Sequence, residues 1–289
     1  MTVFLQYDQA ELDRQYDQRA WAPNAAEVIQ RYSDNSDRAR SLLGEPRECS
    51  YGSSAAETFD LYACASAEAP LHIFIHGGAW RHLSKRESAF AAPAFVRAGA
   101  HFVALNFALL PEVTLTEMAA QVRGAIAWLH RNAEMVGADR ERIFVSGHSS
   151  GAHLAALVAV TDWPGQFDLP ANTVNGVLCV SGIYDLRPVR LSARNGYVRL
   201  TEETELALSP QRHLDRLGCD LVVASAEFDS AEFRRQARSF ADAAGTRARF
   251  IEGKGMNHFE VIETLADREG VIGHAALTQM GLSTCGQPG

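Results

Sequence analysis

The stretch Ile143-Phe144-Val145-Ser146-Gly147-His148-Ser149-Ser150-Gly151-Ala152-His153-Leu154 combines an apolar run, a glycine-framed turn and the start of an Ala/Leu-rich segment. It predicts a strand that turns abruptly into a helix. Such a turn strains the backbone of its central residue by about 1–3 kcal/mol and leaves room only for very small flanking residues. Gly147 and Gly151 flank Ser149 in this way. We predict that Ser149 is a nucleophile exposed at the carboxyl edge of a sheet, the alternative being an ordinary Gly/Ser turn.

The composition indicates a globular protein of the α/β class. The chain has 289 residues, of which 47% are hydrophobic and 21% are charged, and this length suits one large α/β domain. The net charge of −8 argues against a nucleic-acid partner, which requires a basic face. No apolar stretch approaches the 18 residues of a membrane span. The first ten residues contain Asp8 and do not resemble a signal peptide, so we expect a cytoplasmic protein.

The cysteine pattern predicts free thiols and no metal site. The chain has an odd number of cysteines, and they are widely spaced: Cys49, Cys64, Cys179, Cys219 and Cys285. They form no Cys-x-x-Cys motif and no Cys/His cluster. We therefore expect no metal and no cofactor, and a small molecule as the substrate. The sequence leaves the oligomeric state open, with a homodimer as one option.

Apolar runs of strand length alternate with helical patterns along most of the chain. Thr114 and Glu117 fit a capping box at the start of the clearest helix, and a helix is also expected over 232–244. Strands are predicted at 48–52, 58–63, 71–75, 102–105, 143–148, 175–180, 221–226 and 249–251. Such alternation is typical of a mostly parallel sheet with helices on both faces. We predict about eight strands, led by an antiparallel hairpin.

The remaining segments suggest how one domain, residues 1–282, is organised. Residues 1–46 are polar, with helical pieces at 25–32 and 36–43, and should lie across the main body. Residues 184–212 are irregular and read as a cap-like or lid-like insertion over one edge of the sheet. Residues 283–289 are expected to form a loose tail.

A serine nucleophile needs a general base within hydrogen-bond reach. After a turn of this kind the partners follow in the chain order serine, acid, histidine. Only His258 and His274 come after a plausible acid. His274 falls inside an amphipathic helix, whereas His258 follows the last predicted strand in a Gly-rich loop. We predict His258 as the base, against the alternative of an exposed loop histidine.

The acid that orients the base should follow a strand of the sheet. Asp229 comes after the predicted strand 221–226 and 29 positions before His258. Its alternative role is to cap the helix that starts at Ser230, with Glu232 as capping partner. Asp185 is the second candidate for the acid and Glu227 the third.

Backbone amides must also stabilise the negative oxygen of the tetrahedral intermediate. Gly77 and Gly78 follow a buried strand directly, so their N–H groups can approach a carbonyl without Cβ atoms in the way. The amide of Ser150 would be another donor of this oxyanion hole, and one donor is worth roughly 2.7–4 kcal/mol. The alternative for the glycine pair is a plain tight turn. We expect His76 to fix the loop rather than to titrate in catalysis.

Three neighbours of these groups are candidate substrate-binding residues. Trp80 would form a wall of the substrate pocket, with a place in the core as the equal alternative, and Ala79 lies beside it. His148 adjoins the nucleophile. We interpret His148 and His153 as packing or hydrogen-bonding residues of the turn rather than as bases.

Taken together, the chain resembles the α/β-hydrolase fold, and within it the arylformamidase (kynurenine formamidase) group and related esterases with a His-Gly-Gly loop. The resemblance is carried by four motifs: His76-Gly77-Gly78-Ala79-Trp80, Gly147–Leu154, Asp229 and Asn257-His258-Phe259. It extends to Tyr51-Gly52, Phe59-Asp60-Leu61-Tyr62, Phe233-Arg234-Arg235-Gln236 and the segment before Tyr51, and so covers nearly the whole chain.

The resemblance implies cleavage of N-formyl-kynurenine to kynurenine and formate by serine, aspartate and histidine without a metal. Ala79 stands where relatives often have Gly or Tyr, and Ser150 where Ala is common. We expect both to border the acyl pocket and to affect the choice of substrate.

The sequence therefore predicts a metal-free serine hydrolase that acts through an acyl-enzyme on a small amide, with a formamide first. The main alternative is a carboxylesterase for small or xenobiotic esters. A more remote alternative is a ligand-binding protein of this fold without catalysis.

Overall fold

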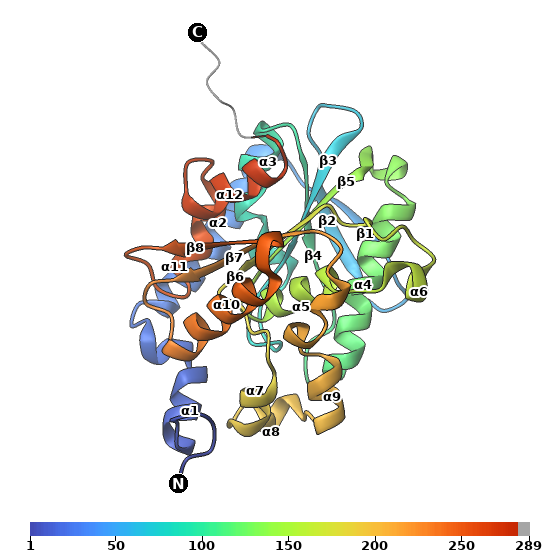
Figure 1. The fold of residues 1–289 in the computed structure, drawn as a ribbon. Coiled ribbons are helices and arrows are strands. Elements are labelled where there is room, and N and C mark those ends of the chain that lie inside the picture. Colours follow the sequence, from blue (N-terminus) through green and yellow to red (C-terminus); the bar gives the residue numbers. More distant parts are fainter. Residues whose placement is uncertain (283–289) are drawn as a thin grey trace.

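The computed structural model describes residues 1–282 and contains one eight-stranded sheet (Figure 1). The expected loose tail, residues 283–289, lies outside the described residues. The strands, listed in chain order, are β1 (Arg47–Ser50), β2 (Thr58–Tyr62), β3 (Ala69–Ile75), β4 (His101–Leu105), β5 (Ala138–His148), β6 (Gly176–Val180), β7 (Asp220–Ala226) and β8 (Ala248–Gly253).

The sheet is mostly parallel, as predicted. The strands lie in the order β1-β2-β4-β3-β5-β6-β7-β8. β2 pairs antiparallel with β1 and with β4, and every other neighbouring pair is parallel. The predicted leading hairpin is therefore confirmed. The parallel strands from β3 to β8 bring their carboxyl ends to one edge, where ligands bind in sheets of this kind.

Helices cover both faces of the sheet, as expected. They are α1 (Gln9–Tyr16), α2 (Ala25–Leu43), α3 (Ala92–Arg97), α4 (Leu115–Arg131), α5 (Ser150–Ala159), α6 (Trp163–Phe167), α7 (Arg187–Leu191), α8 (Asn195–Val198), α9 (Glu202–Ala207), α10 (Ala231–Ala244), α11 (Glu260–Glu263) and α12 (Val271–Gln279). The predicted capping box of α4 is present, with Thr114 and Glu117 bonded to each other's backbone amides.

Alternate residues of the strands feed two hydrophobic clusters, one on each face. On β3, Ile73 and Ile75 belong to the cluster that includes side chains of α4, α5 and α10. Phe74 belongs to the opposite cluster, which includes side chains of α2, α3 and α12. Because successive side chains of a strand point to opposite faces, a strand covered on both sides is apolar throughout, which explains the continuous apolar runs in the sequence.

The helical pieces expected at 25–32 and 36–43 form one continuous helix, α2, so their separation was wrong. Val28, Tyr32, Ser36 and Ala39 are all buried on α2, and their spacing of three and four residues is that of one helix face. The intervening residues Ser33, Asp34 and Asn35 lie away from this face and are not buried. The helix ends at Gly44, as predicted, where φ is +84°.

The N-terminal segment and residues 184–212 contact each other at one end of the molecule, where α1 and α7 lie near each other in Figure 1. The Gln9 side-chain amide donates to the Leu191 carbonyl at 3.0 Å, and the Ala193 amide donates to Asp13 at 2.6 Å. The α1 ring of Tyr16 packs against Phe233 of α10 with centroids 5.6 Å apart. The two segments are thus joined over the main body. Within residues 1–282, no helix is long and apolar enough to cross a membrane.

Four buried histidines lie on or next to β3, β5 and α5: His72, His76, His148 and His153. Burial disfavours a charged imidazole, and it lowers the pKa of His72 and His148 to about 3 and that of His76 and His153 to about 4. In the unfolded chain these side chains return to their ordinary value of 6.5. Below that value the unfolded state binds more protons than the folded state, so stability falls as the pH falls.

We predict that the free energy of unfolding decreases steeply between pH 6.5 and pH 5. Each fully buried histidine contributes about 1.4 kcal/mol per pH unit. Urea unfolding followed by circular dichroism across this range measures the slope. The variant His72→Gln should reduce this slope by about 1.4 kcal/mol per pH unit, the contribution of one proton. A free energy of unfolding that stays constant from pH 7 to pH 5 would contradict this account.

Candidate active site

Ser149 lies at the turn between β5 and α5, in the conformation that the motif predicts. Its backbone has φ +55° and ψ −119°, a region that costs a non-glycine residue of order 1–3 kcal/mol. The two flanking glycines leave no room for a side chain. A Cβ on Gly151 would lie 2.2 Å from the Ile75 carbonyl oxygen, and one on Gly147 would lie 2.2 Å from that of Gly151.

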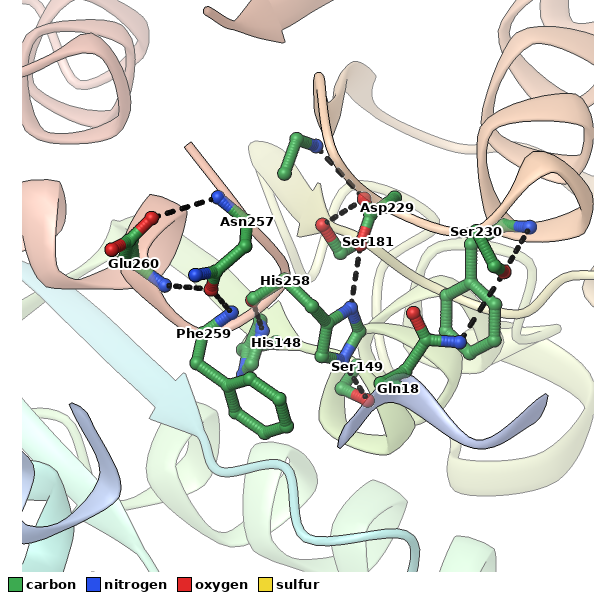
Figure 2. Close-up of polar contacts among 12 residues, drawn as sticks. Gln18, His148, Ser149, Ser181, Asp229, Ser230, Asn257, His258, Phe259 and Glu260 are labelled. Atoms are coloured by element: carbon green, nitrogen blue, oxygen red, sulfur yellow. Dashed lines mark hydrogen bonds and ion pairs between the residues drawn. The ribbon is translucent and has the colours of Figure 1, made fainter. Parts of the chain in front are cut away.

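The structure brings Ser149, His258 and Asp229 together in one hydrogen-bonded line (Figure 2). The distance from Ser149 Oγ to His258 Nε2 is 2.9 Å, and that from His258 Nδ1 to Asp229 Oδ1 is 2.7 Å. Because a carboxylate only accepts hydrogen bonds, the proton is on Nδ1 and the lone pair of Nε2 faces the serine hydroxyl. This tautomer is the one in which a histidine can take the proton of a serine.

Asp229 follows the carboxyl end of β7, and both of its carboxylate oxygens accept hydrogen bonds. Its Oδ2 accepts hydrogen bonds from Ser181 Oγ at 2.6 Å and from the Ala226 amide at 2.8 Å, and the residue is 2% exposed. Charge-assisted hydrogen bonds of this kind hold a carboxylate in place. Ser181 was not singled out from the sequence, although its position directly after β6 and its φ of +50° repeat the pattern of a residue at a strand end.

The alternatives for the acid lie elsewhere in the structure. The Asp185 carboxylate accepts from the Arg187 amide at 3.0 Å, and Glu227 accepts from the Gly255 amide at 2.7 Å. The capping role considered for Asp229 belongs to Ser230, whose hydroxyl accepts from the Phe233 amide at 3.4 Å.

The loop that carries His258 is held from two sides (Figure 2). His148 Nε2 donates to the His258 carbonyl at 2.8 Å, and the low pKa of His148 keeps this donor uncharged at neutral pH. The Asn257 carboxamide donates to Asn24, which precedes α2, at 2.8 Å, and its oxygen accepts from the Phe259 amide at 3.0 Å. The N-terminal segment therefore helps to position the histidine loop.

The loop after β3 runs beside the nucleophile. Gly78 has φ +102°, and a Cβ there would lie 2.0 Å from the His82 carbonyl oxygen. Ala79 and Trp80 follow with φ +54° and +61°, which is strained for residues with side chains. Within residues 1–282 the amides of Gly78 and Ala79 donate no hydrogen bond. Gly77 provides clearance, since a Cβ there would lie 2.9 Å from the His148 carbonyl oxygen.

Two neighbours lie outside the cavity described below, and for Trp80 this is the core position that the sequence held as the equal alternative. Trp80 is 1% exposed and belongs to the core, where its Nε1 donates to His153 Nδ1 at 3.4 Å. It therefore forms no wall of the cavity described below, because the positive φ at this position lets the apolar ring pack inward. The Ser150 hydroxyl does not border an acyl pocket either: it accepts from the Trp80 amide at 3.1 Å and so fastens the loop to α5.

A cavity of about 280 Å³ opens beside Ser149 and His258. Ala79 and His148 line it, as expected for candidate substrate-binding residues. The other lining residues come from the oxyanion loop, the N-terminal segment and the loops around α8 and α11: Asp17, Gln18, Arg19, Ile29, Tyr32, Gly78, His82, Leu83, Arg194 and Phe259. Sequence reasoning missed Arg19 and Arg194, because both lie in segments without a recognisable motif. Among residues 1–282, no three His, Cys, Asp or Glu side chains are grouped to hold a metal ion.

Comparisons with known proteins identify relatives that match nearly the whole chain. Residues 59–212 match the BD-FAE family. The chain is 35% identical to kynurenine formamidase of Danio rerio, over 94% of this chain and 97% of that protein, and 33% identical to that of Salmo salar with the same coverage. The crystal structure of a candidate thioesterase from Silicibacter sp. TM1040 superposes with a TM-score of 0.82 at 27% identity, covering 93% of this chain and 99% of that one.

The eight-stranded sheet, the serine turn and the similarity over nearly the whole chain agree with one another. The chain belongs to the kynurenine formamidase family of serine hydrolases with the α/β-hydrolase fold.

Proposed function

We propose that this hydrolase cleaves the formamide of an N-formyl aromatic amine, with N-formyl-kynurenine as the first candidate. The observation that carries the proposal is the line from Asp229 through His258 to Ser149, which ends at the cavity. The proposed substrate follows from the names of the two fish relatives, both kynurenine formamidases.

The proposed reaction begins with attack of Ser149 Oγ on the formyl carbon while His258 Nε2 takes the serine proton. His258 then donates that proton to the departing amine as the carbon–nitrogen bond breaks. Water attacks the formyl carbon while His258 takes one of its protons. The bond between the formyl carbon and Ser149 Oγ then breaks, His258 returns the proton to Ser149, and formate leaves. Asp229 keeps the imidazole in the required tautomer and stabilises its positive charge.

We assign the negative oxygen of the intermediate to three backbone amides. Gly78 and Ser150 keep the role expected for them, and Ala79 joins them because it lines the cavity with an unused N–H group. Ser150 is the first residue of α5, and the first amides of a helix have no partner within it. We propose that Gly77 acts mainly as a spacer, since a Cβ there would lie 2.9 Å from the His148 carbonyl oxygen.

The cavity suits a small acyl group with an aromatic leaving group. A formyl group needs almost no space of its own, so the volume of about 280 Å³ is free for the rest of the substrate. Tyr32 and Phe259 contribute aromatic rings to its lining.

We propose that residues 1–46 and 184–212 form the rim of this single domain and act as its cap. A cytoplasmic location stays a prediction.

A carboxylesterase is the second candidate, because Ser149, activated by His258 and Asp229, would attack an ester by the same steps. The Silicibacter neighbour is also described as a candidate thioesterase. A non-catalytic ligand-binding role is the remote alternative. It would leave the hydrogen-bonded line of Ser149, His258 and Asp229 without a purpose.

We predict that Ser149→Ala lowers kcat by about 10⁴–10⁶-fold, because the nucleophile is lost. Formate release from N-formyl-kynurenine measures the effect. Ser53→Ala is the control, since Ser53 is an exposed serine that does not line the cavity. Activity that survives Ser149→Ala at the wild-type level removes Ser149 from this role.

Asp229→Asn should lower kcat by about 10³–10⁴-fold, because an amide favours the wrong histidine tautomer. Asp185→Asn, measured beside it, should keep kcat close to that of the unsubstituted enzyme, since the Asp185 carboxylate accepts a hydrogen bond from its own loop and not from the histidine. The reverse order of the two effects would make Asp185 the acid.

The substrate assignment predicts a larger kcat/KM for N-formyl-kynurenine than for p-nitrophenyl acetate under the same conditions. Both substrates can be followed by absorbance with one enzyme preparation. A much larger kcat/KM for the ester would favour the carboxylesterase.

A further inference from the structure

We propose that Arg194 binds a carboxylate carried by the leaving group of the substrate, an inference that rests on the proposed function of the cavity. Arg194 lines the same cavity as Ser149. Its guanidinium Nη2 donates to the Tyr16 carbonyl, whereas its Nη1 is buried and has no hydrogen-bond partner.

The missing partner is unusual for an arginine in this position. A buried donor of a charged group that makes no hydrogen bond is costly. Within residues 1–282 no carboxylate pairs with Arg194, whereas the buried carboxylates of Glu205 and Glu232 pair with other arginines. The Tyr16 ring, 5.5 Å away, offers Arg194 only its face. Because Nη1 is closed off from solvent, a substrate carboxylate would supply the missing acceptor after a small turn of the guanidinium toward the cavity.

The charges around the cavity favour an anion. Two arginines line it, Arg19 and Arg194, against the single carboxylate of Asp17, whose oxygen accepts from the Arg19 amide at 3.2 Å. Burial and the guanidinium groups of Arg81 and Arg19 lower the pKa of His82, which lies in the same lining. A locally positive cavity in a chain of net charge −8 is the arrangement that attracts anionic ligands.

The reaction fixes which part of the substrate can carry this carboxylate. A formyl group has no position for a further substituent, so the charged group must belong to the amine that leaves. N-formyl-kynurenine, the candidate substrate proposed above, carries a carboxylate on this part of the molecule. Guanidinium groups bind carboxylates with two parallel hydrogen bonds. Nη1 of Arg194 would donate one of them, and Nη2, which already donates to the Tyr16 carbonyl, would share in the other.

The test compares charged substrates with their neutral isosteres. The formamide pair is N-formyl-kynurenine and its carboxamide, and the ester pair is 3-acetoxybenzoate and 3-acetoxybenzamide. Each is assayed with the unsubstituted enzyme, Arg194→Gln, Arg194→Lys and Arg187→Gln. Arg187 is a matched control, since it is an exposed arginine of the same segment that does not line the cavity.

We expect Arg194→Gln to lower kcat/KM for the carboxylate substrates by about 10- to 100-fold, the range of one hydrogen bond between charged groups. The loss should fall mainly on KM, with little change for the carboxamides. Arg194→Lys should restore part of the preference, and Arg187→Gln should leave it intact. An equal loss for both members of a pair, or no loss, overturns the role of Arg194.

The two proposals can fail separately. Turnover of the ester pair without turnover of the formamides contradicts the formamidase assignment, and the ester pair then still tests Arg194. Formamide turnover that ignores the carboxylate contradicts only Arg194. Calorimetry with Ser149→Ala gives a readout without turnover: N-formyl-kynurenine should bind about 10-fold or more tightly than its carboxamide, and equal binding contradicts the proposal.

Discussion

The close passage of β5 and α5 around Ser149 is the constraint on which the site depends. A Cβ on either flanking glycine would lie 2.2 Å from a backbone oxygen, so only glycine fits. This crossing forces Ser149 to φ +55° and presents its hydroxyl at the carboxyl edge of the sheet. The strain of order 1–3 kcal/mol is compensated by the two hydrophobic clusters that hold strand and helix in place.

A second consequence of the crossing is the placement of the loop after β3, which carries the proposed oxyanion donors Gly78 and Ala79. The Ser150 hydroxyl on α5 holds the Trp80 amide, and the Trp80 ring is anchored in the core beside His153. Three successive positive φ values at Gly78, Ala79 and Trp80 are thereby stabilised. The proposed nucleophile and the proposed amide donors thus belong to one connected unit, which is what preorganised stabilisation of a negative oxygen requires.

Much of this arrangement could be predicted from the sequence because it follows from local rules. Continuous apolar runs marked the buried strands, and the chain order serine, acid, histidine selected Asp229 and His258 before any distance was known. What could not be predicted depends on contacts between distant segments. Trp80 packs inward because of its backbone angle, Ser181 reaches Asp229 across 48 positions, and Arg194 meets the N-terminal segment at Tyr16. For Trp80 the sequence left core and pocket equally open, and neither Ser181 nor Arg194 stands in a motif that indicates its partner.

The central claim is that His258 and Asp229 activate Ser149 as the nucleophile. Labelling with a fluorophosphonate, followed by intact mass and peptide mapping, tests it most directly. The account predicts one covalent adduct, on Ser149 rather than on the neighbouring Ser150, and labelling that is lost in Ser149→Ala and strongly slowed in His258→Ala. An adduct on another residue, or labelling that is unaffected by either substitution, would contradict it.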